Sequence, residues 1–334
     1  MATKIVVTDY LEPDFQWEQD ELRKRGLDFQ WEAHQAKFAK EDELVKVIGD
    51  AEVVVVNMAR MTSGVIGRLS RARLIIRHGI GYDNVDTAAA TAAGIRVANI
   101  PDYCVQEVAE QALMLILAAA RHLPEQRYSM ERSVAKGQWD FSVVRPVFQM
   151  KGKTLGIVGC GRIGSTVLGM VGGLGMNILV CDPYLSAERQ AELGVQTVSL
   201  ETVLAESDIL TLHTPLNAET RGKINAAALR TMKPSAVLVN TARGPLVSDA
   251  DLAEALQKGV IAGAAIDVYD LEPPKPDNPL LGAPNCLLTP HLSWYSEESG
   301  WSIREKILED VIRHLEGRPP RFTVNKDVEG RLRK

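Results

Sequence analysis

A glycine-rich turn between an expected strand and an expected helix constrains this chain more than any other feature. The turn reads Gly159-Cys160-Gly161-Arg162-Ile163-Gly164, and Asp182 lies about 20 residues further on, at the end of the next expected strand. Gly159 permits a tight turn, Gly161 lets a pyrophosphate approach the backbone, and Gly164 lets the helix pack closely on the strand. The free amides at the helix N-terminus would bind phosphates. The motif predicts dinucleotide binding. It favours NAD over NADP, because the Asp182 carboxylate would accept from ribose hydroxyls and repel a 2′-phosphate.

Short β-branched runs alternate with helical stretches through nearly the whole chain. Strands of a first series are expected at Ile5–Thr8, Val53–Asn57, Leu74–Arg77 and Arg96–Asn99, and those of a second at Leu155–Val158, Ile178–Cys181, Ile209–His213, Val237–Asn240, Ala264–Asp267 and Leu287–Leu288. Apolar runs without strict alternation are typical of strands buried on both faces. A long apolar helix is expected over Val105–His122, between the two series, and a last one over Glu297–Glu316. The pattern predicts an α/β protein with parallel sheets.

The composition excludes several other classes. The net charge of -5 and the absence of a long basic run argue against nucleic acid or an anionic membrane as a partner. The longest apolar run, Ala112 to Ala120, is too short to cross a bilayer that needs about 20 residues. Four scattered cysteines without a CxxC pair suggest reduced thiols rather than disulfides or a zinc site. With no signal peptide pattern at the start, we expect a cytoplasmic protein without a metal.

Three further polar residues follow expected strands of the second series: Arg243, Glu272 and His291. Ligands of doubly wound sheets bind at the carboxyl ends of strands. A guanidinium can hold a carboxylate and an adjacent carbonyl in fixed geometry. A His beside a carboxylate forms an acid–base pair, because the carboxylate fixes the ring's tautomer and favours its protonated form. Taken singly, each residue is more often a surface ion pair or a structural side chain. Their shared position at strand ends favours a catalytic group.

These motifs together are recognisable. The chain resembles the D-isomer-specific 2-hydroxyacid dehydrogenase family over essentially its full length. The resemblance rests on the segments 152–164, 238–244, 267–273 and 289–291, in that order and at similar spacing. Within the family, the runs 77–84, 182–185 and 290–297 are most similar to the C-terminal-binding-protein branch.

The resemblance implies a role for each of these residues. Arg243 would bind the substrate carboxylate and 2-oxo group, His291 would be the general acid/base, and Glu272 would orient it. The cofactor would contact Gly159, Gly161, Arg162, Ile163, Gly164, Asp182, Thr214, Pro215, Ala242 and Asp267, the last through the nicotinamide carboxamide. The substrate would contact Arg77, Trp294 and the backbone amides of Gly79, Ile80 and Gly81. Alternatives remain for two of them: Arg162 as a solvated helix residue and Trp294 as a core residue.

The resemblance also implies a domain map and an assembly. Two Rossmann-like or flavodoxin-like domains are expected, with an NAD-binding domain (103–292) inserted into a substrate-binding domain (1–102 and 293–334). A homodimer joined through the cofactor domain is expected. Leu113–Leu117 would contribute to that contact, to an interdomain contact or to the core.

The expected function is that of an NAD-dependent oxidoreductase acting on CH–OH groups, a D-2-hydroxyacid dehydrogenase or 2-oxo acid reductase. Hydride would pass between nicotinamide C4 and substrate C2, with His291 moving the proton. D-3-phosphoglycerate dehydrogenase and glyoxylate–hydroxypyruvate reductase both stay open as the specific activity. The competing class is an NADH-responsive protein-binding module similar to the corepressors of the C-terminal-binding-protein branch.

Overall fold

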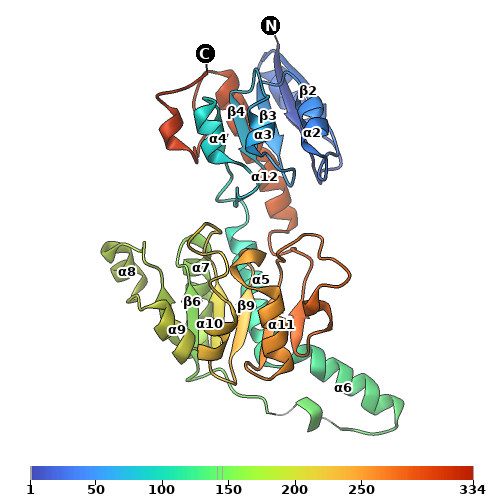
Figure 1. The fold of residues 1–334 in the computed structure, drawn as a ribbon, viewed down its shortest axis with the longest axis vertical. Coiled ribbons are helices and arrows are strands. Elements are labelled where there is room, and N and C mark those ends of the chain that lie inside the picture. The colour runs from blue at the N-terminus through green and yellow to red at the C-terminus, as the bar shows by residue number, and fades with distance from the viewer. Residues whose placement is uncertain (1, 141, 145, 334) are drawn as a thin grey trace. The chain divides into compact units, whose positions relative to one another are not determined.

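The chain divides into two compact units, each built on one parallel sheet (Figure 1). The computed structural model describes residues 2–140, 142–144 and 146–333. Unit 1 comprises Met1–Cys104 and Ser296–Lys334, and unit 2 comprises Val105–Tyr295. The predicted α/β class with two parallel sheets is confirmed.

The sheet of unit 1 has five strands in the order β2-β1-β3-β4-β5. The strands are β1 (Thr3–Val7), β2 (Phe29–Ala33), β3 (Val53–Val56), β4 (Leu74–Arg77) and β5 (Arg96–Ala98). This is the flavodoxin-like order, in which the chain reverses direction across the sheet between β1 and β3. The loops after those two strands therefore flank the crevice where a sheet of this kind would bind a ligand.

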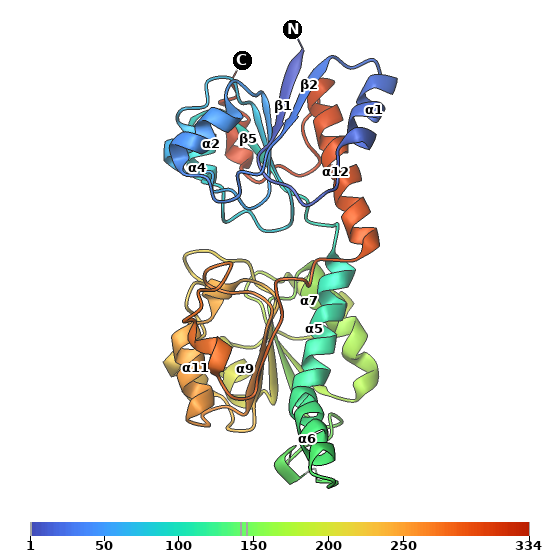
Figure 2. The same ribbon diagram turned by 90° about the vertical axis from the view of Figure 1, so that its right-hand side faces the viewer.

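Helices cover both faces of this sheet (Figure 2). The helices of unit 1 are α1 (Gln16–Lys24), α2 (Glu41–Ile48), α3 (Ser63–Ile66), α4 (Thr87–Ala92) and α12 (Glu297–Leu315). The first and last pack on one face, and the other three pack on the opposite face. All four residues of β3 are buried, which explains why this run, Val53–Val56, is continuously apolar.

Strand β2 (Phe29–Ala33) was not expected from the sequence. This strand pairs only with β1, in the register Thr3 with Phe29, and none of its residues is fully buried. An edge strand needs no apolar face on both sides. Its mixed run of Phe, Gln, Trp, Glu and Ala therefore lacks the signal that marks the central strands.

The sheet of unit 2 has six strands in the order β11-β10-β9-β8-β6-β7. They are β6 (Thr154–Val158), β7 (Asn177–Cys181), β8 (Ile209–Leu212), β9 (Val237–Asn240), β10 (Gly263–Ile266) and β11 (Cys286–Leu288). The chain reverses here between β6 and β8, so the loops after these strands flank the ligand crevice of a dinucleotide-binding sheet.

Two layers of helices enclose the sheet of unit 2. The helices are α5 (Val105–Ala120), α6 (Leu123–Ala135), α7 (Arg162–Val171), α8 (Ala187–Leu193), α9 (Leu200–Glu206), α10 (Ala226–Thr231) and α11 (Asp249–Gln257). Single 3-10 turns of this unit lie at Ser142–Val144, Gly172–Leu174, Gly244–Leu246 and Pro279–Gly282, and another lies in unit 1 at Lys326–Val328. Helices α5 and α7 share a core with one face, and α9, α10 and α11 share a core with the other (Figure 2).

The long helix expected over Val105–His122 ends at Ala120, and a second helix, α6, follows it. His122 takes a left-handed conformation with φ 51°, and Pro124 stands in the first turn of α6. Proline is favoured at the start of a helix, where its missing amide costs nothing. No helix in the described part of the chain has both the length and the apolar character needed to cross a bilayer.

Candidate active site

The glycine turn lies at the carboxyl end of β6, where the chain enters α7. Gly159 has φ 87°, and a Cβ there would stand 2.7 Å from the carbonyl oxygen of His213, in the loop after β8. A Cβ on Gly164 would overlap the carbonyl oxygen of Gly159, so helix and strand approach as closely as the motif predicts. A Cβ on Gly161, by contrast, would meet no atom within 4 Å. The structure therefore explains Gly159 and Gly164 by packing and leaves open space above Gly161.

This space and its surroundings fit the pyrophosphate of a dinucleotide. Gly161 is the N-cap of α7, and no side chain caps the helix. An uncapped helix N-terminus presents unsatisfied amides and a partial positive charge. Asp182 follows β7 and is oriented by two amides, with Oδ2 accepting from Cys160 at 2.8 Å and Oδ1 from Tyr184 at 3.0 Å. The carboxylate thus stands beside the glycine turn, where ribose recognition needs it.

The loop after β8 forms the other wall of the crevice. His213 packs its backbone against Gly159, and its Nε2 lies 3.0 Å from the hydroxyl of Thr211. Desolvation lowers the pKa of His213 to about 4, so the ring is neutral near pH 7. Thr214 and Pro215 continue this loop, and the carbonyl of Pro215 accepts from Thr220 at 2.7 Å. The expected cofactor contacts of Thr214 and Pro215 stay predictions.

Glu272 and His291 form a direct pair. His291 Nδ1 lies 2.6 Å from Glu272 Oε2, and Glu272 Oε1 accepts from the Tyr269 amide at 3.0 Å. Burial opposes ionisation of Glu272, but the hydrogen bond and charge interaction with His291 outweigh it and keep the pKa of that carboxyl below its usual value. Because the ionised carboxylate accepts the Nδ1–H, Nε2 is left as the ring atom that can exchange a proton with a substrate.

His291 lies in a turn that Asp267 stabilises by hydrogen bonds. The residue has φ 54°, a left-handed conformation that costs a non-glycine residue of order 1 kcal/mol. Its amide donates to the carbonyl of Asp267 at 2.8 Å. The fully buried Asp267 carboxylate accepts from the Thr289 hydroxyl, the Leu292 amide, and both the amide and hydroxyl of Ser293. These contacts stabilise the conformation that aims the His291 ring at Glu272.

The Asp267 network was not foreseen from the sequence. In the described conformation both carboxylate oxygens serve the turn, each with two donors. The expected contact with a nicotinamide carboxamide therefore stays a prediction. Hydroxyl side chains two residues before and two residues after His291 were the available signal, in the run Thr289-Pro290-His291-Leu292-Ser293.

Arg243 follows β9 in the same unit. Its Nη1 donates to the carbonyl of Ala242 at 2.8 Å, and its charge helps keep Glu272 ionised. Thus Ala242, expected to lie near the nicotinamide, presents a carbonyl already engaged by the neighbouring guanidinium. Trp294 also belongs to unit 2 and packs edge-on against Tyr295, with ring centroids 5.3 Å apart. Its role in a substrate pocket stays a prediction.

The remaining expected substrate residues belong to unit 1. Arg77 ends β4 and donates from Nη1 to the carbonyl of His78 at 2.6 Å. Of the three amides expected to bind a carboxylate, that of Gly79 donates to the carbonyl of Arg77. For the amides of Ile80 and Gly81, no acceptor lies among the described residues. Two of the three therefore remain available to a ligand.

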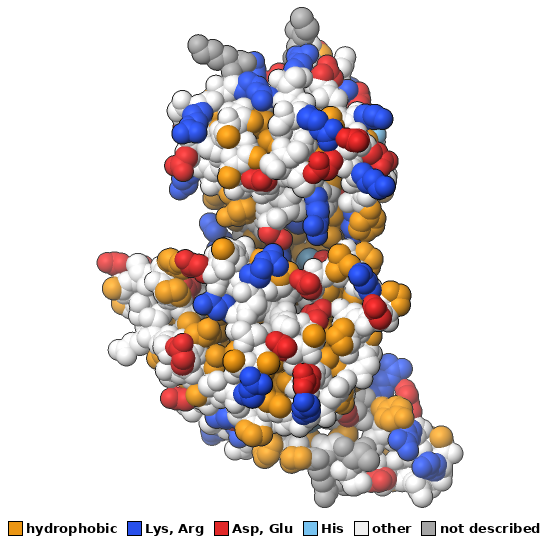
Figure 3. Space-filling view, viewed as in Figure 1, with side chains coloured by type: hydrophobic (Ala, Val, Ile, Leu, Met, Phe, Trp, Pro, Cys, Tyr) orange, Lys and Arg blue, Asp and Glu red, His pale blue; other side chains and the backbone are white. Residues whose placement is uncertain are grey.

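Positive and negative side chains are interspersed over the face drawn in Figure 3. Within residues 2–140, 142–144 and 146–333, no group of three or more His, Cys, Asp or Glu side chains is arranged to hold a metal ion.

Comparison with known families identifies the unit that carries this geometry. Residues 113–293 match the model of the D-isomer specific 2-hydroxyacid dehydrogenase, NAD binding domain. The chain belongs to this dehydrogenase family. The matched residues fall within unit 2, so the glycine turn and the Glu272–His291 pair both lie in the family's NAD-binding domain.

Relatives within the dehydrogenase family carry several activities. The chain is 38% identical to a D-3-phosphoglycerate dehydrogenase of Archaeoglobus fulgidus, over 92% of this chain and 56% of that protein. It is 40% identical to a glyoxylate reductase of Korarchaeum cryptofilum, over 77% of each. A crystal structure of the Aquifex aeolicus D-lactate dehydrogenase with NAD and lactic acid matches with a TM-score of 0.82 and 28% identity, over 94% of this chain and 96% of that one. The chain thus spans little more than half the length of the phosphoglycerate dehydrogenase.

Proposed function

We propose that this chain is an NAD-dependent D-2-hydroxyacid dehydrogenase that reduces a small 2-oxo acid. The observation that carries the proposal is the 2.6 Å pair of Glu272 and His291, in the same unit as an uncapped, open glycine turn. An acid–base pair and a dinucleotide crevice in one sheet are what reversible carbonyl reduction requires.

Each residue has a stated task. The glycine turn, Gly159 to Gly164, would hold NADH, which would supply the hydride for substrate C2. His291 gives its Nε2 proton to the 2-oxo oxygen, and Glu272 stabilises the ring while it is protonated. Arg243 binds the carboxylate through its planar guanidinium. Within unit 1, the amides of Ile80 and Gly81 are available to bind a carboxylate.

The carboxylate of Asp182 supports NAD as the preferred cofactor. It stands at the end of β7, where the adenosine ribose of a dinucleotide lies in this fold. Its oxygens would accept from the 2′-hydroxyl, and its negative charge would repel a 2′-phosphate.

We propose unit 1 as the substrate-binding domain and a homodimer as the assembly. In α6, the side chains of Leu123, Met130 and Val134 are 55%, 56% and 61% exposed. At about 100° per residue these three positions share one face of the helix. An apolar stripe of this kind supports an isologous contact with a second copy of the chain.

The four free cysteines support the cytoplasm as the compartment.

Glyoxylate and hydroxypyruvate are the favoured substrates, since relatives similar over most of their own length include a glyoxylate reductase and a hydroxypyruvate reductase.

A substrate panel tests the proposal. NADH oxidation is followed at 340 nm with glyoxylate, hydroxypyruvate, pyruvate and a phosphorylated hydroxypyruvate, and D-3-phosphoglycerate is offered in the reverse direction. We expect turnover of at least one 2-oxo acid, and a loss of at least 1,000-fold in kcat for His291→Ala at unchanged NADH affinity. No turnover on any member, or an active His291→Ala variant, contradicts the proposal.

A further inference from the structure

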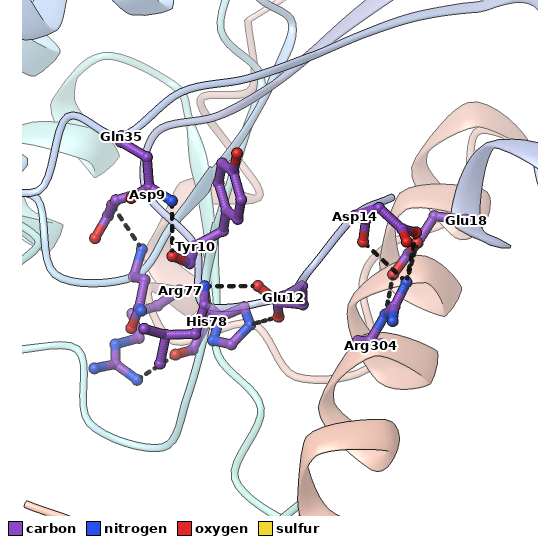
Figure 4. Close-up of polar contacts among 11 residues, drawn as sticks. Asp9, Tyr10, Glu12, Asp14, Glu18, Gln35, Arg77, His78 and Arg304 are labelled. Carbon is purple, nitrogen blue, oxygen red and sulfur yellow. Dashed lines mark hydrogen bonds and ion pairs between the residues drawn. The ribbon is translucent and has the colours of Figure 1, made fainter. Parts of the chain in front are cut away.

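Two acidic side chains follow β1 in unit 1 and reach into neighbouring loops of the same sheet (Figure 4). The Asp9 carboxylate accepts from the amides of Asn57, Met58 and Ala59, at 3.3, 2.6 and 3.3 Å, in the loop after β3. Glu12 reaches the next loop, after β4, where its Oε1 lies 2.6 Å from Nε2 of His78. The segment after β1 therefore ties together the loops after β3 and β4.

Both members of the second pair are buried. The side chain of His78 is 8% exposed and that of Glu12 is 9% exposed. Burial opposes ionisation of Glu12, but the hydrogen bond and charge interaction with His78 hold the pKa of the Glu12 carboxyl at about 2. The other oxygen of Glu12 accepts from the Leu11 amide at 3.0 Å, so the carboxylate is fixed at both ends.

His78 is held in three directions. Its amide donates to the carbonyl of Val56 at 2.8 Å, its carbonyl accepts from Arg77 Nη1 at 2.6 Å, and its ring is bound by Glu12. The three contacts come from β3, from β4 and from the loop after β1. A residue restrained in this way has one backbone orientation, and it sets the direction in which the following residues leave β4.

Those following residues are Gly79, Ile80 and Gly81. The carbonyl of Gly79 accepts from the Ile100 amide at 3.0 Å, and the carbonyl of Ile80 accepts from the side-chain amide of Asn99 at 2.6 Å. With these carbonyls held, the amides of Ile80 and Gly81 have no acceptor among the described residues. The loop thus has fixed carbonyls and two donors left over.

A buried ion pair is a costly way to stabilise a domain. Removing two charged groups from water costs several kcal/mol, and well-packed apolar side chains often stabilise a fold as much or more. What a buried pair adds over apolar packing is a fixed distance and direction between two segments. Here the fixed segment is the loop that bears the two free amides.

We propose that Glu12 and His78 are positioning residues, which hold the loop after β4 so that the amides of Ile80 and Gly81 can bind the carboxylate of a 2-oxo acid. The proposal rests on the proposed function for the identity of that ligand. Neither residue is assigned a contact with substrate or a part in the proton transfer.

The same unit offers a matched control. Glu18, in α1, is paired with Arg304, in α12, through two hydrogen bonds of 2.6 and 2.8 Å (Figure 4). Its side chain is 4% exposed, and it lines the same small cavity as Glu12 and His78. This pair joins two helices and does not touch the loop after β4. Glu18→Gln therefore weakens a buried ion pair that makes no hydrogen bond to the loop after β4.

The test compares Glu12→Gln and His78→Gln with Glu18→Gln in the full chain. The first readout is kinetic, on the best 2-oxo acid of the panel. We expect both loop variants to raise the KM for the 2-oxo acid by about tenfold, the effect of weakening one hydrogen bond to a charged group. Their kcat and their KM for NADH should stay within twofold of wild type. Glu18→Gln should leave all three constants within twofold. A second conservative variant, Glu12→Asp, keeps the charge and should restore part of the affinity.

The second readout does not depend on activity. Hydrogen exchange should show faster exchange of the His78 and Ile100 amides in Glu12→Gln, but not in Glu18→Gln, because these two hydrogen bonds fix the loop. Unchanged exchange there, an unchanged KM in a folded Glu12→Gln protein, or an equal rise of KM in Glu18→Gln overturns the proposal. Faster exchange in a protein that turns over no 2-oxo acid would support the positioning role and contradict the proposed function instead.

Discussion

Replacing Glu272 with Gln tests the acid–base pair most directly. The substitution keeps the size of the side chain and its acceptor for the Tyr269 amide, but it removes the charge that faces His291 at 2.6 Å. The protonated ring therefore loses its counter-charge. We expect reduction of a 2-oxo acid to slow, because the ring no longer faces a carboxylate that stabilises its positive charge.

The magnitude follows from the geometry. Side chains of Glu272 and His291 are 20% and 32% exposed, so water screens their interaction only partly. A hydrogen bond to a charged group under such conditions contributes about 2 kcal/mol, which corresponds to roughly a 30-fold fall in kcat at pH 7.

The sign of the pH effect separates this mechanism from simple damage. The pKa of Glu272 is lowered in the folded protein, so in wild type the carboxylate stays ionised well below neutral pH. Wild type should therefore lose the help of this charge only as the pH falls through the lowered pKa of Glu272, whereas the variant, which has no carboxylate there, should show no such acid-side fall. Initial rates at 340 nm, followed as a function of pH, measure both kcat and this profile.

The control is Glu254→Gln. Glu254 lies on α11 of the same unit and forms an exposed ion pair with Lys258, so the substitution removes a charge far from His291 in sequence. It should leave the profile unchanged. If Glu272→Gln folds normally and shows the wild-type kcat and pH profile, the pair does not assist proton transfer.

Three further predictions concern the cofactor crevice and unit 1. Gly161→Ala should keep the wild-type Tm, because no atom lies within 4 Å of its new Cβ, but it should bind NADH at least tenfold more weakly in a fluorescence titration. Gly164→Ala should instead lower the Tm, because its Cβ overlaps the carbonyl of Gly159. Equal behaviour of the two variants would contradict this division. Asp182→Ala should reduce the preference for NADH over NADPH at least tenfold in kcat/KM, and an unchanged ratio would place the ribose elsewhere. Burial raises the pKa of the fully buried Asp310 from 3.8 to about 6, so the folded state prefers the protonated carboxyl. The contribution of Asp310 to the free energy of unfolding is complete below pH 3.8, and about 3 kcal/mol of it is lost as the pH rises through 6. Urea unfolding should show that Asp310→Asn lacks this decline, and parallel pH dependences in the two proteins would refute it.

The parts of the fold that could be predicted were those with a strong local signal. The central strand β3 is buried along its whole length and reads as an uninterrupted apolar run, and the glycine turn allows only one arrangement of strand and helix. The edge strand β2 has a mixed run, and α6 begins directly after a left-handed His122. The run of β2 carries no periodicity that distinguishes it from its surroundings, and α6 follows α5 with only Arg121 and His122 between them.

The candidate site divides in the same way. Arg243, Glu272 and His291 could be proposed because parallel strands bring their carboxyl ends to one edge, which turns sequence order into proximity. The contact of Glu12 with His78 joins residues 66 positions apart through two loops. No spacing rule relates such loops, so only the folded sheet brings the pair together.

Asp9 has a consequence for the relation between the two sheets. In each sheet the strand order reverses once, and loops flank that point. In unit 2 the glycine turn leaves open space there, whereas in unit 1 the Asp9 carboxylate accepts from three amides of the loop after β3. A covalently tethered ligand loses almost no entropy on binding and cannot be diluted away. The amides after β3 in unit 1 are therefore bound by a carboxylate of the same chain at any ligand concentration, whereas the glycine turn of unit 2 can take a ligand from solution.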